Sequence, residues 1–187
     1  HDAIKLANNI YQPKNAPDIA IEAQHNSAEL RKNYLDIPEN GKLDDELSRN
    51  LIHGYYASVT YMDALIGELI TNLDELGLRE NTLIIFTGDN GTDNPVVSMM
   101  DNISVEGGKG RTTDNGTHVP LIVNWKGKIK PYSMSETLVD FSDFFPTLCE
   151  AAGITLDSNM DLDGISFYPR LMGKEGPERK WIHTWYN

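Results

Sequence analysis

One long apolar stripe constrains this chain more than any other feature. Large apolar side chains recur at steps of three and four from residue 51 to residue 76. That spacing predicts one face of an α-helix of about eight turns. Asp44 or Asp45 can cap its start, and Gly77 can end it. Such a helix needs a sheet face on which to bury its stripe. The stripe consists of Leu51, Tyr55, Val59, Met62, Ile66, Leu69, Leu73 and Leu76.

Short apolar segments after this helix predict strands. Thr82–Thr87 is β-branched and nearly continuously apolar, as in strands that a parallel sheet buries on both faces. Val119–Trp125 predicts a second buried strand, and the alternation in Trp181–Tyr186 predicts a third. A short helix is expected at Asp140–Ala152. A long helix, a tight turn and a buried strand form half of a βαβ unit, so the fold class is α/β.

The remaining segments set the organisation of the chain. Residues 1–43 are polar and interrupted by Pro and Gly, which indicates a loop-rich lead-in with one short helix near Ala28–Tyr34. Residues 44–187 carry the α/β pattern. Within them, residues 93–118 are expected to form a long polar loop without regular structure, and a loop of that length is usually functional or disordered.

Composition excludes several partners. The chain has 187 residues, with 16 Lys and Arg against 28 Asp and Glu, for a net charge of −12. This acidic balance argues against sequence-independent binding of nucleic acid and against an anionic membrane surface. No apolar run reaches the roughly 18 residues of a membrane span. A single cysteine, Cys149, excludes an internal disulfide and any site built from cysteines alone.

Asp89 and Asn90 are the first candidate site residues. They follow the strand Thr82–Thr87, and ligands of open α/β sheets bind beyond the carboxyl ends of the strands. One charged and one neutral oxygen suit a hard cation such as Ca²⁺, whereas a Zn²⁺ site would more often use His or Cys. The alternative is that Asp-Asn-Gly is simply a turn.

Lys109 and His118 are the other candidates. Lys109 lies among three glycines, which let backbone N–H groups approach an anion while Lys supplies a point charge. The spacing is not that of a Walker motif, and such a stretch is more often a solvated loop. A lone histidine before a strand, such as His118, is more often structural than catalytic.

Taken in order, these motifs resemble the second half of a type I sulfatase, the arylsulfatase branch of the alkaline phosphatase superfamily. The resemblance covers roughly Leu47 to Leu171. Each motif alone is weak evidence for the family, but the set of motifs in this order is specific to it. The motifs are Tyr55–Asp63, Asn81–Gly91, Gly108–Gly110, Thr117–Val123 and Asp143–Leu148.

The resemblance implies a fold and a reaction. The fold would be part of an alkaline-phosphatase-like three-layer sandwich, with a mostly parallel central sheet flanked by helices. Residues 44–187 would form the second half of the α/β domain and end at the start of the C-terminal subdomain. The reaction would be hydrolysis of a sulfate ester at a Ca²⁺ site, on a sulfated small molecule or glycan, in the periplasm or outside the cell.

The resemblance also implies residue roles. Asp89 and Asn90 map onto metal ligands, and Lys109 maps onto the catalytic lysine that contacts the sulfate. His118 stands where many relatives have Arg. It is therefore a candidate for a residue that holds the metal or sulfate ligands in place without contacting the metal or the sulfate itself. His1 is either a sulfate-contacting histidine or the remnant of a tag.

Three elements of the family have no counterpart in this sequence, namely the nucleophile, the paired N-terminal aspartates that complete the metal site, and the first lysine–histidine set. The family nucleophile is a formylglycine made within Cys/Ser-x-Pro-x-Arg, and no such motif occurs here. We therefore expect the chain to be a piece of something longer, trimmed upstream, with the formylglycine in a missing N-terminal half. Alone, it should be inactive and bind Ca²⁺ weakly, because two oxygens fall short of the six to eight that Ca²⁺ takes.

Two alternatives stay open. One is a phosphoester or phosphonate hydrolase of the same superfamily, against which Asn90 argues because two-metal relatives usually place His after the Asp. The other is a non-catalytic module that binds a metal or an anion. The strand Thr82–Thr87 is of a type that is normally buried, and few strands of this chain could flank it. We therefore expect either an open apolar sheet edge or pairing of this strand with another chain, and we favour the pairing.

Overall fold

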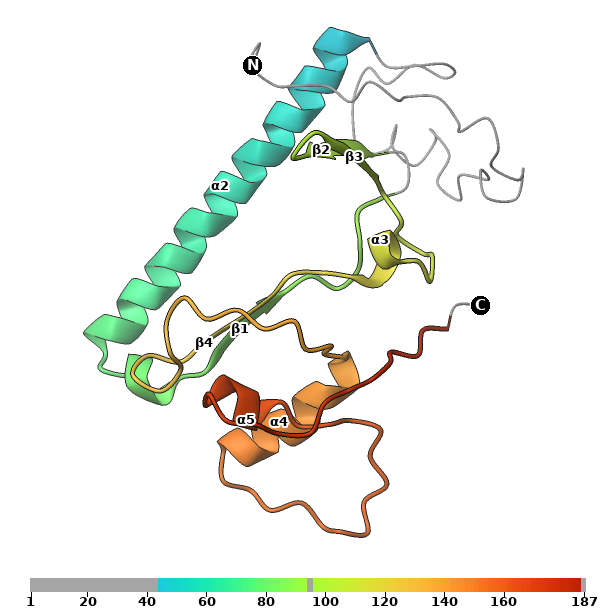
Figure 1. Cartoon of the computed structure of the whole chain (residues 1–187). Coiled ribbons are helices and arrows are strands. Elements are labelled where there is room, and N and C mark those ends of the chain that lie inside the picture. The colour runs from blue at the N-terminus through green and yellow to red at the C-terminus, as the bar shows by residue number, and fades with distance from the viewer. Residues whose placement is uncertain (1–43, 94–95, 186–187) are drawn as a thin grey trace. The chain divides into compact units, whose positions relative to one another are not determined.

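The computed structural model describes residues 44–93 and 96–185 (Figure 1). These residues fall into two compact units. The described part of the first unit contains residues 44–71, 88–93 and 96–120, and the second unit contains Asn72–Thr87 and Leu121–Trp185. The expectations for the lead-in, for the helix near Ala28–Tyr34 and for His1 lie outside the described residues.

Helix α2 (Asp45–Glu75) confirms the predicted long helix. The Asp44 Oδ1 atom caps it by accepting a hydrogen bond of 2.7 Å from the Leu47 N–H. Gly77, at φ +68°, lets the chain turn at the C-terminal end, where the Leu78 N–H donates to the Leu73 carbonyl at 2.9 Å. The local signals therefore set both ends of this helix.

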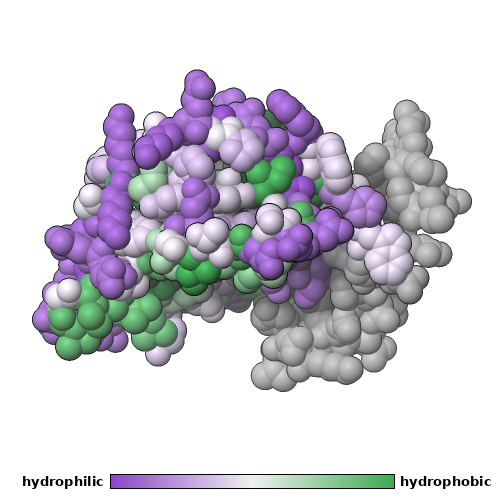
Figure 2. Space-filling view, turned by 90° about the horizontal axis from the view of Figure 1, so that it is seen from below, coloured by the Kyte–Doolittle hydropathy of each residue, from purple (hydrophilic) through white to green (hydrophobic). Residues whose placement is uncertain are grey.

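The apolar stripe of α2 has no fully buried member, although Leu51, Ile66 and Leu73 are partly covered. No residue of the helix is buried, and Tyr55 and Leu69 are 67% and 56% exposed. The expected burial of the stripe on a sheet face is therefore not seen in the part of the chain that the structure describes. On the face drawn in Figure 2, hydrophobic residues (green) lie among hydrophilic ones (purple). None of the described helices is both long and apolar enough to cross a membrane.

The two predicted buried strands form, but they run antiparallel. Strand β1 (Ile84–Thr87) pairs with β4 (Leu121–Asn124) in a two-stranded sheet. The predicted mostly parallel sheet is thus absent from the described strands. A parallel pair needs a crossover connection, usually helical, whereas the described residues between β1 and β4 form a hairpin and the one-turn helix α3 (Asp114–Thr117).

The β1–β4 pair leaves apolar side chains in contact with solvent. Phe86 and Ile122 stand opposite each other in the register and are 38% and 59% exposed. Within the described residues, each strand has one partner, so the outer edges of this pair are open. Strand pairing with another chain stays a prediction.

The described residues of the segment 93–118, namely 93 and 96–118, have more regular structure than their polarity predicts. Strands β2 (Val97–Met100) and β3 (Ile103–Glu106) form an antiparallel hairpin. Asp101 and Asn102 make the turn with φ values of 48° and 67°, which is the geometry of a two-residue hairpin loop. The expectation of a structureless loop was wrong because these two residues replace the Asn-Gly or Asp-Gly pair that usually signals such a turn.

Helix α4 (Phe144–Ala151), with the preceding 3₁₀-helix η3 (Phe141–Asp143), confirms the predicted helix at Asp140–Ala152. Asp140 caps η3, since its Oδ1 atom accepts from the Ser142 N–H at 3.0 Å. The strand predicted at Trp181–Tyr186 is wrong for residues 181–185, which form no strand. Among the described residues, an isolated bridge joins Leu138 and Arg179, just before this segment. The other short helices are η2 (Arg79–Asn81) and α5 (Tyr168–Leu171).

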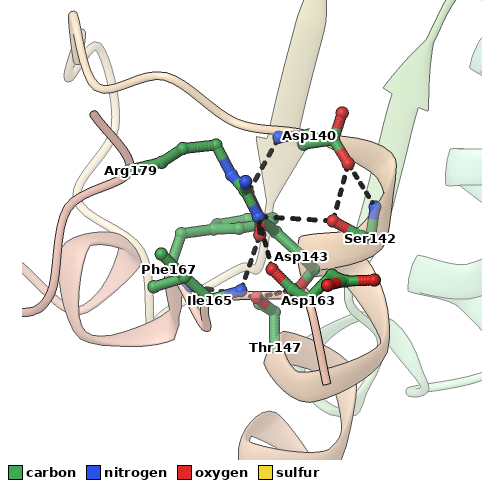
Figure 3. Close-up of polar contacts among 8 residues, drawn as sticks. All are labelled: Asp140, Ser142, Asp143, Thr147, Asp163, Ile165, Phe167 and Arg179. Carbon is green, nitrogen blue, oxygen red and sulfur yellow. Dashed lines mark hydrogen bonds and ion pairs between the residues drawn. The ribbon is translucent and has the colours of Figure 1, made fainter. Parts of the chain in front are cut away.

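A buried ion pair organises the second unit (Figure 3). The Asp143 side chain is almost fully buried and accepts hydrogen bonds from Arg179 Nη2 at 2.5 Å and from the Ile165 N–H at 2.6 Å. The buried Thr147 hydroxyl donates to the Asp143 carbonyl at 2.6 Å and accepts from the Phe167 N–H at 3.0 Å. This network ties η3 and α4 to chain segments 20 to 36 residues later.

Charge pairing sets the ionisation of this network. Burial alone would raise the pKa of the Asp143 carboxyl, but the hydrogen bonds from Arg179 and from the backbone N–H groups of Asp140 and Ile165 hold the pKa below its ordinary value. The hydrogen bond to Asp143 raises the pKa of Arg179. Both groups are therefore charged at neutral pH.

The Arg179→Ala change should destabilise the protein by about 3–5 kcal/mol, because it leaves the Asp143 carboxylate buried without its partner. The Arg170→Ala change is the matched control, since its pair with Glu178 is 31% and 43% exposed and should contribute no more than about 1 kcal/mol. Denaturant unfolding measures both. Equal losses for the two variants would contradict a special role for the buried pair.

Acidic pH should lower the free energy of unfolding through protonation of Asp143. A carboxyl whose folded pKa is lowered contributes stability that is present above its unfolded pKa and is lost as the pH falls through the folded value. The free energy of unfolding should therefore decline below about pH 4, the region of an ordinary Asp pKa. The Asp143→Asn change should flatten that decline in a pH series of unfolding curves. An unchanged slope would show that other carboxyls cause it.

Candidate functional site

Asp89 and Asn90 follow β1 closely and have exposed side chains. The Asn90 N–H donates to Asp89 Oδ1 at 2.9 Å, and Asn90 Nδ2 donates to the Gly91 carbonyl at 2.9 Å. These bonds engage one carboxylate oxygen of Asp89 and the amide nitrogen of Asn90. The other Asp89 oxygen and the Asn90 Oδ1 atom are the two hard donors that this turn offers to a cation.

Backbone hydrogen bonds bring this turn and the Lys109 segment together. The Thr92 carbonyl accepts from the N–H groups of Gly108 and Lys109, both at 2.9 Å. The Gly91 N–H donates to the Gly116 carbonyl at 2.9 Å. The residues that follow Asn90 therefore lie directly beside the Gly-Lys-Gly segment and the end of α3. Sequence order separates these segments by more than fifteen residues, but the fold makes them neighbours.

Glycines make this close approach possible. A Cβ atom at Gly91 would stand 2.0 Å from the Asn115 carbonyl oxygen, and one at Gly107 would stand 1.9 Å from the Asp93 carbonyl oxygen. A Cβ atom at Gly116 would stand 2.3 Å from the carbonyl oxygens of both Arg111 and Gly108. Any side chain at these positions would push the segments apart.

Asn115 completes the support of the site. Its Oδ1 atom accepts from the Thr113 hydroxyl at 2.5 Å, and its Nδ2 atom donates to the Glu106 carbonyl at 3.1 Å. The side chain thus links α3 to the end of β3 beside Gly107. Sequence reasoning gave no site role to Asn115, Gly91 or Gly116, and it connected Gly107 with the approach of an anion and not with this packing. The glycine spacing was the available signal, but only the contacts show what each glycine allows.

His118 lies at the end of α3 and pairs with Asp114. The His118 Nδ1 atom is 3.2 Å from Asp114 Oδ1, and both side chains are exposed. Among the described residues, His118 therefore contacts Asp114 and not the candidate metal ligands Asp89 and Asn90. A supporting role of His118 toward the metal stays a prediction.

The donors present fit part of a Ca²⁺ site. Asp89 and Asn90 provide oxygen atoms, which is the ligand type that Ca²⁺ takes. Among the described residues, no group of three or more His, Cys, Asp or Glu side chains is placed to hold a metal. A complete coordination shell therefore needs further oxygen ligands beyond these two residues.

A separate cavity lies in the second unit. It has a volume of about 550 Å³ and is lined by residues that include Asp140, Arg179 and Trp181. None of the four candidate residues lines it. Arg179 is already bound to Asp143, so this cavity surrounds a structural ion pair.

Comparison with known proteins identifies the family. Residues 10–154 match the Sulfatase family model, and this range contains all four candidate residues. The uncharacterized sulfatase YdeN of Escherichia coli (strain K12) is 33% identical over 164 residues, which cover 83% of this chain and 29% of that protein. Human arylsulfatase A is 38% identical over 120 residues, which cover 62% of this chain and 23% of that protein.

A solved structure agrees with these sequence matches. The crystal structure of PsFucS1 sulfatase from Pseudoalteromonas sp. matches with a TM-score of 0.56 at 35% identity, over 68% of this chain and 26% of that chain. This chain thus spans less than a third of the length of these relatives. The resemblance in the ordered motifs is confirmed, and the chain belongs to the sulfatase family.

Proposed function

We propose that this chain is part of a Ca²⁺-dependent enzyme that hydrolyses sulfate esters. In this proposal, Asp89 and Asn90 supply two metal ligands, and Lys109 contacts the sulfate and acts as a catalytic residue. The observation that carries the proposal is the pair of hydrogen bonds from Gly108 and Lys109 to the Thr92 carbonyl. These bonds put the lysine segment beside the Asp-Asn turn within a family of sulfatases.

In this proposal, Lys109 and the Ca²⁺ ion that Asp89 and Asn90 help to bind contribute positive charge to the reaction. Cleavage of a sulfate ester builds negative charge on the oxygens of the sulfate group, and a positive group held in place lowers the barrier. The ammonium group of Lys109 would supply that charge from a turn that the glycines hold rigidly. When bound, Ca²⁺ would act as a Lewis acid toward a sulfate oxygen.

Other parts of the protein would complete the active site. Cys/Ser-x-Pro-x-Arg does not occur in this sequence, so we assign the formylglycine nucleophile and the remaining metal ligands to residues outside this chain. The chain alone is then inactive. We assign to His118 a supporting role through its pair with Asp114 at the end of α3, and we place the enzyme in the periplasm or outside the cell.

The substrate class is a sulfated small molecule or glycan. A phosphoester or phosphonate hydrolase of the same superfamily is the second candidate for the reaction. Asn90 disfavours it, because a neutral amide is a poor ligand for a second, borderline metal. An assay of full-length protein with an aryl sulfate and the matching aryl phosphate separates the two reactions, and preference for the phosphate would overturn the proposal.

The Lys109→Ala change should lower turnover of an aryl sulfate by about 10²- to 10³-fold in the full-length protein, as expected when one preorganised charged donor is lost. The exposed Lys174 lies in the second unit, so Lys174→Ala is the matched control and should retain full turnover. Steady-state kinetics at saturating substrate measure the effect. Full activity of Lys109→Ala would remove this residue from the active site.

The Asp89→Ala change should weaken Ca²⁺ binding to the full-length protein by about tenfold or more, because it removes a charged ligand. The exposed Asp161 is the matched control, and Asp161→Ala should bind Ca²⁺ normally. Isothermal titration with Ca²⁺ measures both affinities without any need for turnover. Equal affinity of the Asp89 variant and the unmodified protein would exclude Asp89 as a ligand.

A further inference from the structure

A tight turn carries a second cation close to Lys109. The Arg111 N–H donates to the Gly108 carbonyl at 2.9 Å, and Gly110 has φ +80° at the third position of the turn. This is a type II β-turn, whose first and last α-carbons lie within about 7 Å of each other. Lys109 and Arg111 therefore project from one short, rigid element, two residues apart.

Packing fixes the backbone of Arg111 against the rest of the site. Its carbonyl oxygen lies so close to Gly116 that a Cβ atom there would be 2.3 Å away. The Gly116 carbonyl in turn accepts the Gly91 N–H, next to Asn90. Arg111 is thus connected through one glycine to the Asp-Asn turn, and through the β-turn to Lys109. The backbone of Arg111 is therefore held in place, so that binding of a ligand has only the side chain of Arg111 to order.

The charge of Arg111 is not neutralised by the described residues. Lys126, Arg170, Arg179 and Lys180 each have a carboxylate partner, whereas Arg111 has none among the described residues. Arg111 as a residue is half-buried. None of its guanidinium nitrogens is a buried atom without a hydrogen-bond partner. In a chain with 28 acidic and 16 basic residues, this leaves an accessible cation beside the candidate site.

We propose that Arg111 binds a second anionic group of the substrate. A guanidinium group binds a carboxylate or a sulfate through two parallel hydrogen bonds. The substrate would then be a sulfate ester that carries a carboxylate or another sulfate near the ester that is cleaved, as on a multiply charged glycan. This inference rests on the proposed function, in which Lys109 contacts the sulfate that is cleaved.

The test measures kcat/KM of the full-length protein for three disaccharide substrates. One carries a single sulfate and no other charge, the second carries one sulfate and a uronate carboxylate, and the third carries two sulfates. The Arg111→Gln change should lower kcat/KM for a doubly charged substrate by about 10- to 100-fold, mainly through KM, because a charged hydrogen bond is lost in both the bound and transition states. It should change kcat/KM for the singly charged substrate by less than about threefold.

Matched variants separate recognition from loss of charge or structure. The Arg49→Gln change removes the same charge from α2 and should leave all three rates unaltered. The Arg111→Lys change keeps the charge without the planar guanidinium group, so its rates should lie between those of the unmodified protein and those of the Arg111→Gln variant. The substrate with the larger loss identifies the second group as carboxylate or sulfate. Equal losses on all three disaccharides, or no loss on any, would overturn the proposal.

Binding distinguishes this proposal from the proposed function. If the unmodified protein releases sulfate neither from the disaccharides nor from an aryl sulfate, the proposed function fails. Isothermal titration of the same disaccharides still decides the role of Arg111. Weaker binding of only the doubly charged compounds to the Arg111→Gln variant supports recognition of a second anion, and unaltered binding overturns it.

Discussion

Close backbone packing around a few glycines is the constraint on which the candidate site depends. Gly91, Gly107 and Gly116 each face a carbonyl oxygen at a distance that leaves no room for a Cβ atom. This packing lets the Thr92 carbonyl reach the N–H groups of the Lys109 segment. The turn that carries Lys109 and the turn of Asp89 and Asn90 are therefore held together by backbone contacts, and the Asn115 side chain adds its hydrogen bonds to them, which favours a rigid site.

The second unit is held by a different interaction. Trp125 and Phe167 are the buried large apolar residues among those described, and the fully buried side chains are Asp143 and Thr147. A charged pair and a hydroxyl thus occupy the centre of this unit. Removing either member of such a pair costs more than the pair contributes, because a buried charge is left without its partner. The pair specifies one arrangement of η3, α4 and the segment that contains Arg179.

Apolar surface remains exposed on both secondary-structure types. The stripe of α2 has no buried member, and Phe86 and Ile122 of the β1–β4 pair are exposed. Each large apolar side chain left in water forgoes about 1.5–3 kcal/mol of burial. Among the described residues, the helix and the strand pairs are therefore present without a large shared apolar core.

Local patterns in the sequence determined much of this protein. The period of the stripe and the residues Asp44 and Gly77 specify α2, and the apolar runs locate β1 and β4. The ordered motifs identify the sulfatase family. Only the tertiary structure decided that β1 and β4 run antiparallel, that Arg179 pairs with Asp143, and that the turn of Lys109 and Arg111 lies beside the residues that follow Asn90. Helix period and caps act over a few residues, whereas strand direction and ion pairing depend on groups that meet only after the chain has folded.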